Sequence, residues 1–272
     1  AERDAFIALE PQSKKWFRRW LGADEFLNGY ERWCLWLGDC PPSELRAMPE
    51  AMKRVQAVKN ARLASKSAPT RKLADTPTRF HVENMPDTSY LVLPEVSSER
   101  RVFIPFGFEN PETLCSNLVK VGPNASLLHF GVLSSTMHNA WVRATCGRLE
   151  SRYRYSKDIV YNNYPWPGFA GEPLSDKHRN AIEQAAQCVL DARAQFAEAS
   201  LADLYDPLTM PPALLKAHQK LDAAVDAAYQ PSGGKKTYAS DAERVAFPLE
   251  LYQRITSLLP APNARKCKRH NP

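Results

Sequence analysis

Four charged side chains stand at alternate positions in one short stretch of the sequence: Arg148, Glu150, Arg152 and Arg154. Alternate residues of a β-strand point to the same face, so this spacing predicts a strand with one fully charged face. Arginine can donate two hydrogen bonds to a guanine, and glutamate can accept one from the amino group of cytosine. Such a row could read the edges of DNA bases. The alternative is a solvated strand face that binds nothing.

The segments on either side position this charged strand. Before it, the sequence predicts a helix that starts at Ser126 and is ended by Gly147. Its apolar residues recur at spacings of three and four, at Phe130, Leu133, Met137, Trp141 and Ala144. After the strand, Lys157 continues the charge, and Pro165 and Pro167 end the extended segment. We therefore expect the charged row to lie on a rigid strand.

A second charged group follows Pro49, which suits the first turn of a predicted helix. The apolar stripe of this helix is formed by Met52, Val55, Val58 and Leu63. The remaining positions and the following segment carry Lys53, Arg54, Lys59, Arg62, Lys66, Arg71 and Lys72. These lysine and arginine side chains form either an ordinary solvated face or a ridge that contacts phosphates. The candidate phosphate contacts are Lys53, Arg54, Lys59, Arg62 and Lys157.

The rest of the first 168 residues indicates a mixture of strands and helices. Residues 32–37 form a nearly continuous apolar strand. Residues 89–95 and 101–105 are expected to pair as a hairpin around a polar connection, and a short strand is expected at 117–121. The fold class predicted for this part is therefore α+β.

After residue 168 the pattern becomes helical. Three apolar stripes at helical spacing are predicted, the third with Pro248 near its first turn. They are Ile182, Ala185, Val189, Ala192 and Phe196; Leu214, His218, Leu221, Val225 and Ala228; and Val245, Leu249, Tyr252, Ile255 and Leu259. We therefore predict a mixed α/β domain over 1–168, a small helical subdomain over 169–260 and a basic, disordered tail over 261–272.

The composition is that of a globular protein that could meet a polyanion. The chain has 272 residues, of which 44% are hydrophobic and 24% charged, and its net charge is +6. No run of about 18 apolar residues predicts a membrane span. The six cysteines form no Cys-x-x-Cys pair, which favours free thiols in a reducing cytoplasm. The first residues lack an initiator Met and a signal-peptide pattern, which predicts the cut edge of a longer protein.

No complete catalytic apparatus is found in the sequence. The segment 233–235 lacks the other residues of a phosphate loop, and neither a Gly-x-Ser-x-Gly elbow nor a His-Glu-x-x-His helix occurs. A methyltransferase acting on a base amino group would need Pro-Pro-aromatic after an acidic or amide residue, and a glycine-rich cofactor turn. Both are missing. His129, His138 and Cys146 do not share a helix face, so we predict a packed role for His138 and no metal site.

Five segments, in this order along the chain, resemble one family. They are Gly22–Phe26, Glu31–Leu37, Arg101–Pro105, Leu127–Leu133 and the run from Arg152 to Pro167. The family is that of the MmeI-like (type IIL) restriction-modification enzymes, in which an adenine-specific DNA methyltransferase is fused to a nuclease. The chain resembles their target-recognition and C-terminal helical regions over nearly its whole length. By this resemblance, the nuclease and the catalytic domain precede the region that the chain matches.

The resemblance implies base-reading residues, partners and a cofactor. The positions that match the family's base readers are Glu95, Asn117, Leu118, Glu150, Arg152 and Arg154. Leu118 could contact a thymine methyl group or belong to the core. The implied partners are double-stranded DNA and the N-terminal catalytic domain of the same polypeptide, in the cytoplasm of a bacterium. S-adenosylmethionine would be bound by that catalytic domain, and this chain alone would hold no cofactor and no catalytic residue.

Two other classes of function stay open beside sequence-specific DNA recognition. A self-contained enzyme with dispersed catalytic residues would show a deep cleft with perturbed carboxylates. An RNA-binding or protein-interaction module would show exposed aromatic side chains on a sheet instead of a charged strand. We expect a fragment that grips the duplex through phosphates, reads base edges and presents one adenine to the catalytic domain.

Overall fold

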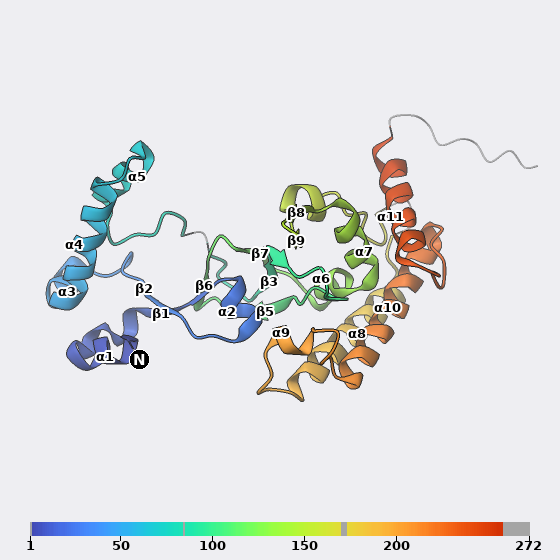
Figure 1. Cartoon of the computed structure of the whole chain (residues 1–272), viewed down its shortest axis with the longest axis horizontal. Coiled ribbons are helices and arrows are strands. Elements are labelled where there is room, and N and C mark those ends of the chain that lie inside the picture. Colours follow the sequence, from blue (N-terminus) through green and yellow to red (C-terminus); the bar gives the residue numbers. More distant parts are fainter. Residues whose placement is uncertain (1, 84, 170–172, 258–272) are drawn as a thin grey trace, which may run out of the picture. The chain divides into compact units, whose positions relative to one another are not determined.

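A computed structural model describes residues 2–83, 85–169 and 173–257 (Figure 1). The chain divides into two compact units. The first is made of the residues up to 94 and 107–124, and the second of 95–106 and the described residues after 124. Helices and small sheets occur together, which confirms the predicted α+β class. The predicted boundary at residue 168 stays a prediction, and the predicted tail at 261–272 lies outside the described residues.

The first unit combines two three-stranded sheets with helices. Its helical segments are α1 (Glu2–Leu9), η1 (Pro11–Trp16), α2 (Ala23–Asn28), α3 (Pro42–Arg46), α4 (Pro49–Leu63), α5 (Ala68–Lys72) and η2 (Leu73–Asp75). Its strands are β1 (Phe17–Leu21), β2 (Trp33–Leu35), β3 (Tyr90–Pro94), β5 (Gly107–Glu109), β6 (Thr113–Cys115) and β7 (Val119–Pro123). The sheet orders are β2-β1-β6 and β5-β3-β7. Only the β1–β6 pair is parallel among these pairs of described strands.

The central strand β3 shows that the predicted hairpin between 89–95 and 101–105 is wrong. Every residue of β3 is buried, and its partners are β5 and β7. Residues 101–105 form no strand. Instead, Phe103 and Ile104 are buried in the second unit, where the Ile104 N–H donates to Asn139 Oδ1 at 2.9 Å. A short apolar run has no period that separates a strand from a buried extended segment, so the sequence could not distinguish the two.

Helix α4 exposes most of its surface. Ala51 and Val55 are buried in a cluster that it shares with α3, whereas Met52, Val58 and Leu63 are exposed. The predicted apolar stripe is therefore wrong except at Val55. Ala51 and Val55 are four positions apart and share one face of the helix, and this is the face that packs in the cluster.

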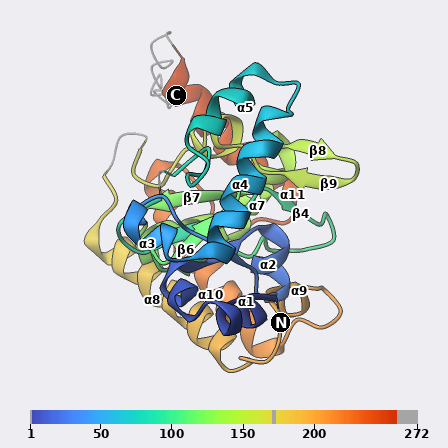
Figure 2. The ribbon, with the colours of Figure 1, turned by 90° about the vertical axis from the view of Figure 1, so that its left-hand side faces the viewer.

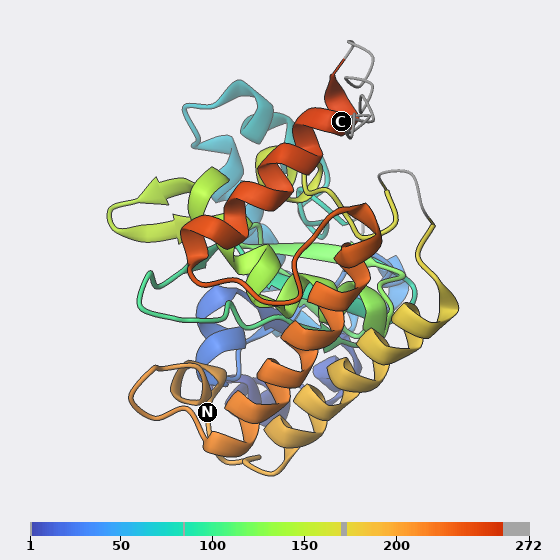
Figure 3. The same ribbon diagram turned by 90° about the vertical axis from the view of Figure 1, so that its right-hand side faces the viewer.

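The second unit contains one small sheet and most of the long helices. Its strands are β4 (Val96–Ser97), β8 (Gly147–Leu149) and β9 (Arg152–Arg154), in the order β4-β9-β8. Its helices are α6 (Leu127–Ser134), α7 (Thr136–Thr145), α8 (Asp176–Ala194), α9 (Leu201–Leu204), α10 (Pro212–Tyr229) and α11 (Asp241–Thr256), with the short segments η3 (Lys157–Tyr161) and η4 (Gln230–Ser232). Figures 2 and 3 show the β8–β9 hairpin extending beyond the helices of its unit.

The long helices bury the predicted apolar stripes of α8 and α10. All the predicted residues on these two helices are buried, which confirms both stripes, and Phe196 just beyond α8 is half-buried. Helix α11 differs because Ser240 caps it by accepting a hydrogen bond from the Glu243 N–H at 3.2 Å. The helix therefore begins earlier than expected, and Pro248 lies inside it. Pro248 and Leu251 are buried, whereas Leu249 and Ile255 of the predicted stripe are exposed, and Leu259 lies outside the described residues.

The predicted single helix before the charged strand is two helices, α6 and α7. Ser135 separates them and caps α7, because its hydroxyl accepts a hydrogen bond from the His138 N–H at 3.3 Å. The first residue of α7, Thr136, donates its N–H and its hydroxyl to the two carboxylate oxygens of Asp222, each at 2.6 Å. Burial raises the pKa of Asp222 to about 6. As expected, Gly147 directly follows the end of the helix, whose C-cap is Cys146, and it also begins β8.

Candidate nucleic-acid interface

The charged stretch is a hairpin, and the single charged strand predicted from its alternation is wrong. Strands β8 and β9 pair antiparallel with Leu149 opposite Arg152, which leaves Glu150 and Ser151 as a two-residue turn. Such turns need a positive φ, and Glu150 adopts a φ of 57°. Neither turn residue is the Gly or Asn that usually marks this geometry, so the sequence carried no turn signal.

The two faces of the hairpin carry different residues. Directly opposed residues of an antiparallel pair point to the same face. Arg152 and Arg154 therefore share one face with Leu149, and all three are exposed. Tyr153 points to the other face, where it is buried and where the Arg148 guanidinium lies 4.2 Å above its ring. Arg148 thus does not belong to the same face as the other two arginines.

At the hairpin tip, Arg152 is paired with Glu150. The Arg152 Nη2 atom donates to Glu150 Oε2 at 2.8 Å across the turn. Their side chains are 46% and 77% exposed. An ion pair this exposed contributes roughly 1 kcal/mol or less to stability, so another partner can replace it at small cost.

Farther from the tip, Arg154 is paired with Glu95. The Arg154 Nε atom donates to Glu95 Oε1 at 3.0 Å, and the side chains are 59% and 13% exposed. Glu95 is held here because β4, which follows it, pairs with β9, and because its carbonyl accepts from the Tyr155 N–H at 2.7 Å. The structure therefore brings together four of the predicted base readers on one small sheet.

A buried histidine anchors the end of the hairpin. The Tyr155 hydroxyl lies 3.2 Å from His138 Nε2, and His138 Nδ1 lies 2.8 Å from the Leu133 carbonyl. The carbonyl can only accept, so Nδ1 carries the proton and Nε2 accepts from Tyr155. Burial lowers the pKa of His138 to about 3, so the ring is neutral near pH 7. The predicted packed role of His138 is confirmed.

The remaining two predicted base readers lie in the first unit. Asn117 and Leu118 occupy the turn that joins β6 to β7, after Ser116, whose hydroxyl accepts from the Leu118 N–H at 3.2 Å. Both side chains are exposed, Leu118 by 53%. Of the two interpretations of Leu118 open at the sequence level, membership of the core is therefore wrong. The predicted strand at 117–121 begins at Val119 because these two residues form the turn.

The predicted phosphate contacts have unequal surroundings. Lys53 pairs with Glu50 at 2.7 Å, Arg54 with Glu2 at 2.8 Å and, in the second unit, Lys157 with Asp158 at 3.6 Å. The Arg62 guanidinium donates to the carbonyls of Leu73, Thr76 and Arg79 at 2.7–2.8 Å, which fastens the segment after α5 to α4. Lys59 is exposed and has no partner among the described residues.

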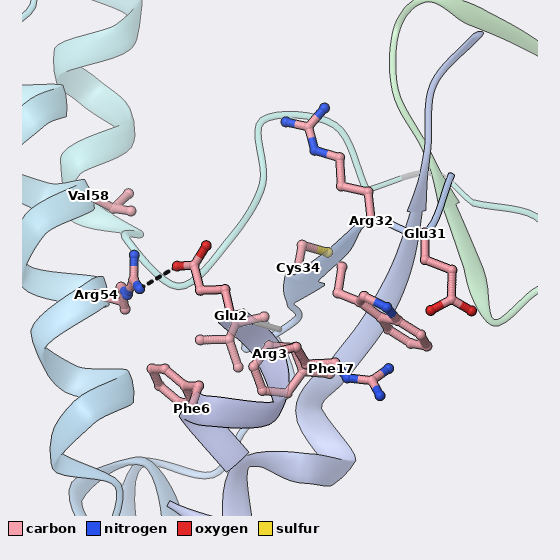
Figure 4. Close-up of a pocket in the computed structure, with 11 residues that line it drawn as sticks. Glu2, Arg3, Phe6, Phe17, Glu31, Arg32, Cys34, Arg54 and Val58 are labelled. Atoms are coloured by element: carbon pink, nitrogen blue, oxygen red, sulfur yellow. Dashed lines mark hydrogen bonds and ion pairs between the residues drawn. The ribbon is translucent and has the colours of Figure 1, made fainter. Parts of the chain in front are cut away.

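A pocket of about 510 Å³ lies in the first unit among α1, β2 and α4 (Figure 4). Arg3, Arg32 and Arg54 line it beside aromatic residues, and so do the carboxylates of Glu2 and Glu31, the first of which pairs with Arg54 at 2.8 Å. Cys34 also lines it, but burial raises the pKa of this thiol to about 11. A protonated thiol is a poor nucleophile, so the pocket has no activated group of this type.

No group of three or more His, Cys, Asp or Glu side chains among the described residues could hold a metal ion. In the same part of the chain, no helix has the length and apolar character needed to cross a membrane.

Two family models match the chain. The target recognition domain of MmeI matches residues 1–168, and the C-terminal domain of MmeI matches residues 174–260. The chain belongs to the MmeI family. The resemblance seen in the five sequence segments is therefore confirmed.

Two proteins to which the chain is similar are much longer than the chain. DNA methyltransferase A of Bacillus subtilis (strain 168) is 39% identical over 246 residues, which cover 90% of the chain and 27% of that protein. The structure of the type IIL restriction-modification enzyme MmeI in complex with DNA is 50% identical and has a TM-score of 0.88; the match covers 94% of the chain and 33% of that protein's chain. The chain thus spans about a third or less of either relative.

Proposed function

We propose that the chain recognises a specific DNA sequence on behalf of an adenine-specific DNA methyltransferase of a restriction-modification system. It reads base edges in the major groove and presents one adenine to a catalytic domain of the same polypeptide, which takes the base out of the stack. The reaction belongs to the bacterial cytoplasm, where DNA is accessible. Support comes from membership of the MmeI family and from the similarity to an MmeI structure that contains DNA.

The observation that carries the proposal is the exposed face of β9, where two guanidinium–carboxylate pairs lie. Arg152 and Arg154 can each donate to a guanine, and Glu150 and Glu95 can each accept from a cytosine. Two residues apart on one strand, the arginines are separated by roughly 6.5–7 Å, about two base-pair steps. One hairpin can therefore address two positions of a recognition site.

Asn117 and Leu118 add the other base contacts in this proposal. The Asn117 amide can make two hydrogen bonds to an adenine. The exposed Leu118 side chain can contact the methyl group of a thymine, which has no hydrogen-bonding requirement.

Phosphate contacts supply much of the affinity and make it depend on salt. We assign them to Lys53, Arg54, Lys59, Arg62 and Lys157. Of these five, Lys59 should make the strongest phosphate contact, because no group in the described part of the chain competes for its ammonium. These contacts fix the register of the protein on the duplex and carry no sequence information.

S-adenosylmethionine belongs in this proposal to the catalytic domain outside the chain. We assign it there because the sequence of the chain carries neither a glycine-rich cofactor turn nor a Pro-Pro-aromatic motif after an acidic or amide residue. Calorimetry of the chain with S-adenosylmethionine should accordingly show no binding at micromolar concentration. Micromolar binding would overturn the assignment of the cofactor to another domain.

The proposed function is tested by selecting duplexes from a randomised DNA library with the full-length protein that carries this chain. The expected result is enrichment of one short motif by the unaltered protein. The Arg152→Ala, Arg154→Ala double variant should lose preference at the positions that this face reads while retaining salt-dependent non-specific binding. An identical enriched motif from both proteins would contradict the proposal.

A further inference from the structure

Arg148 differs from the other two arginines of the hairpin in position and contacts. It lies opposite Tyr153 in the β8–β9 pair, on the face turned away from Arg152 and Arg154. Its guanidinium lies 4.2 Å above the Tyr153 ring, and its Nη1 atom donates to the Ser151 carbonyl at 3.1 Å. One side chain therefore joins the turn to a residue whose own side chain is buried.

The turn that Arg148 contacts needs such support. Glu150 has a φ of 57°, and a side chain with a Cβ atom disfavours this left-handed region. Glycine or asparagine would reduce the cost, but Glu150 and Ser151 occupy the two turn positions. The Glu150–Arg152 ion pair on the exposed face is available to DNA and cannot both hold the turn and read a base.

Tyr153 is a rigid aromatic ring on which the Arg148 guanidinium stacks. The tyrosine is only 6% exposed and lies in the central strand of the β4-β9-β8 sheet, between Ser97 and Arg148. A planar guanidinium stacks on an aromatic ring and still presents its N–H groups at the edge, which an ammonium group cannot do. The stacked orientation directs Arg148 Nη1 at the Ser151 carbonyl.

We propose that Arg148 is a positioning residue for base recognition: from the rear face of the hairpin it holds the Glu150–Ser151 turn in the shape that aims Glu150 and Arg152 at one base pair. This inference rests on the proposed function. It assigns no contact with DNA to Arg148. Its effect on specificity is confined to the position read at the hairpin tip, because Arg154 is held separately by Glu95.

The test compares Arg148→Ala and Arg148→Lys with the matched control Arg100→Ala in the full-length protein. Arg100 is exposed and lies outside the hairpin, so the control removes one positive charge and leaves the turn intact. The first readout is amide hydrogen exchange over residues 149–152, which does not depend on DNA. Exchange should rise about fivefold in Arg148→Ala, the factor that corresponds to one net hydrogen bond. It should rise less in Arg148→Lys, which keeps a donor, and not at all in the control.

The second readout is the map of methylated sites. Arg148→Ala should relax the preference at one base pair, the same one affected by Glu150→Gln, and preserve it elsewhere. Unchanged hydrogen exchange would overturn the inference, and so would raised exchange without relaxed preference where Glu150→Gln does relax it. A uniform loss of affinity with a smaller salt dependence would identify Arg148 as a phosphate contact and also overturn it. If Glu150→Gln itself leaves every preference unchanged, the proposed function fails, while raised exchange still supports the turn-holding contact.

Discussion

The Arg152 guanidinium donates to the Glu150 carboxylate at 2.8 Å across the turn of the β8–β9 hairpin. A hydrogen-bond donor and an acceptor are thereby held together at an exposed tip, and we propose that they meet the two halves of one G·C pair. Because the pair is exposed, exchanging the internal contact for contacts with bases costs roughly 1 kcal/mol or less. The ion pair therefore orients both groups in the absence of DNA without competing strongly with it.

Glu95→Gln should alter recognition at one base pair only, and not at the pair read by the hairpin tip. The amide keeps the shape of the side chain but removes the charge that pairs with Arg154 at 3.0 Å. The expected loss of discrimination is about 1–3 kcal/mol at that position. Competition binding with duplexes that differ by single base pairs measures it. Glu99→Gln is the control, because Glu99 is exposed and has no partner in the described part of the chain. Equal losses at all positions would contradict the assignment.

Lys59 and Arg62 should differ in their effect on stability when each is changed to glutamine. Lys59→Gln should lower the slope of log affinity against log salt by about one while leaving stability unchanged, since its ammonium has no internal partner among the described residues. Arg62→Gln should lower the free energy of unfolding by roughly 1–3 kcal/mol, because three carbonyls lose their charged donor.

Salt titrations of DNA binding and urea denaturation separate these two effects. Neutralising Lys53, Arg54, Lys59 and Arg62 together should reduce the salt dependence further. An unchanged slope in that fourfold variant would mean that α4 does not face DNA.

Asp222 should make the protein less stable as the pH rises from about 4 to 6. Burial raises the pKa of Asp222 in the folded state to about 6, above the ordinary value of 3.8 that applies to the unfolded chain, so on raising the pH the unfolded chain releases this proton first. The free energy of unfolding therefore falls over this window. Asp222→Asn removes the titrating group and keeps an acceptor for the Thr136 N–H.

The stability of Asp222→Asn relative to the unaltered protein should consequently increase by on the order of 2–3 kcal/mol between pH 4 and pH 7. Urea denaturation at a series of pH values measures this difference. The control is Glu250→Gln, at an exposed position on α11. Its curve of stability against pH should be parallel to that of the unaltered protein. Parallel curves for Asp222→Asn as well would contradict the prediction.

The fold was predictable from the sequence where one period extends over many residues. The apolar stripes of α8 and α10 continue through whole helices, and their residues are buried as expected. The hairpin was missed because alternation of charge continues through Glu150 and Ser151, and no glycine or asparagine marks the turn. Alternation at every second residue therefore describes each of the two strands correctly, but when it is continued through the turn it assigns Arg148 to the wrong face.

The candidate site was only partly predictable because one of its ion pairs joins residues that lie far apart in the sequence and meet only in the folded chain. Glu95 and Arg154 meet although 59 positions separate them, through the pairing of β4 with β9. No local pattern encodes that contact, and Glu95 entered the predicted set through the family resemblance alone. Likewise, nothing in the order of the lysine and arginine residues on α4 shows that Arg62 donates to carbonyls while the Lys59 ammonium remains available to bind a phosphate.

The central claim, that the hairpin tip reads DNA bases, is tested most directly by exchanging its two charges in the full-length protein. Glu150→Lys with Arg152→Asp keeps a donor and an acceptor but exchanges their places, and lysine at position 150 has the same backbone cost as glutamate because both carry a Cβ atom. The measurement is a map of the methylated sites made by the folded, active variant. The account predicts that the preferred base changes at one position of the site, with about 1–3 kcal/mol of discrimination against the original base. If the pair were only a surface ion pair, the exchange would cost under about 1 kcal/mol, and an unchanged preference at every position would contradict the account.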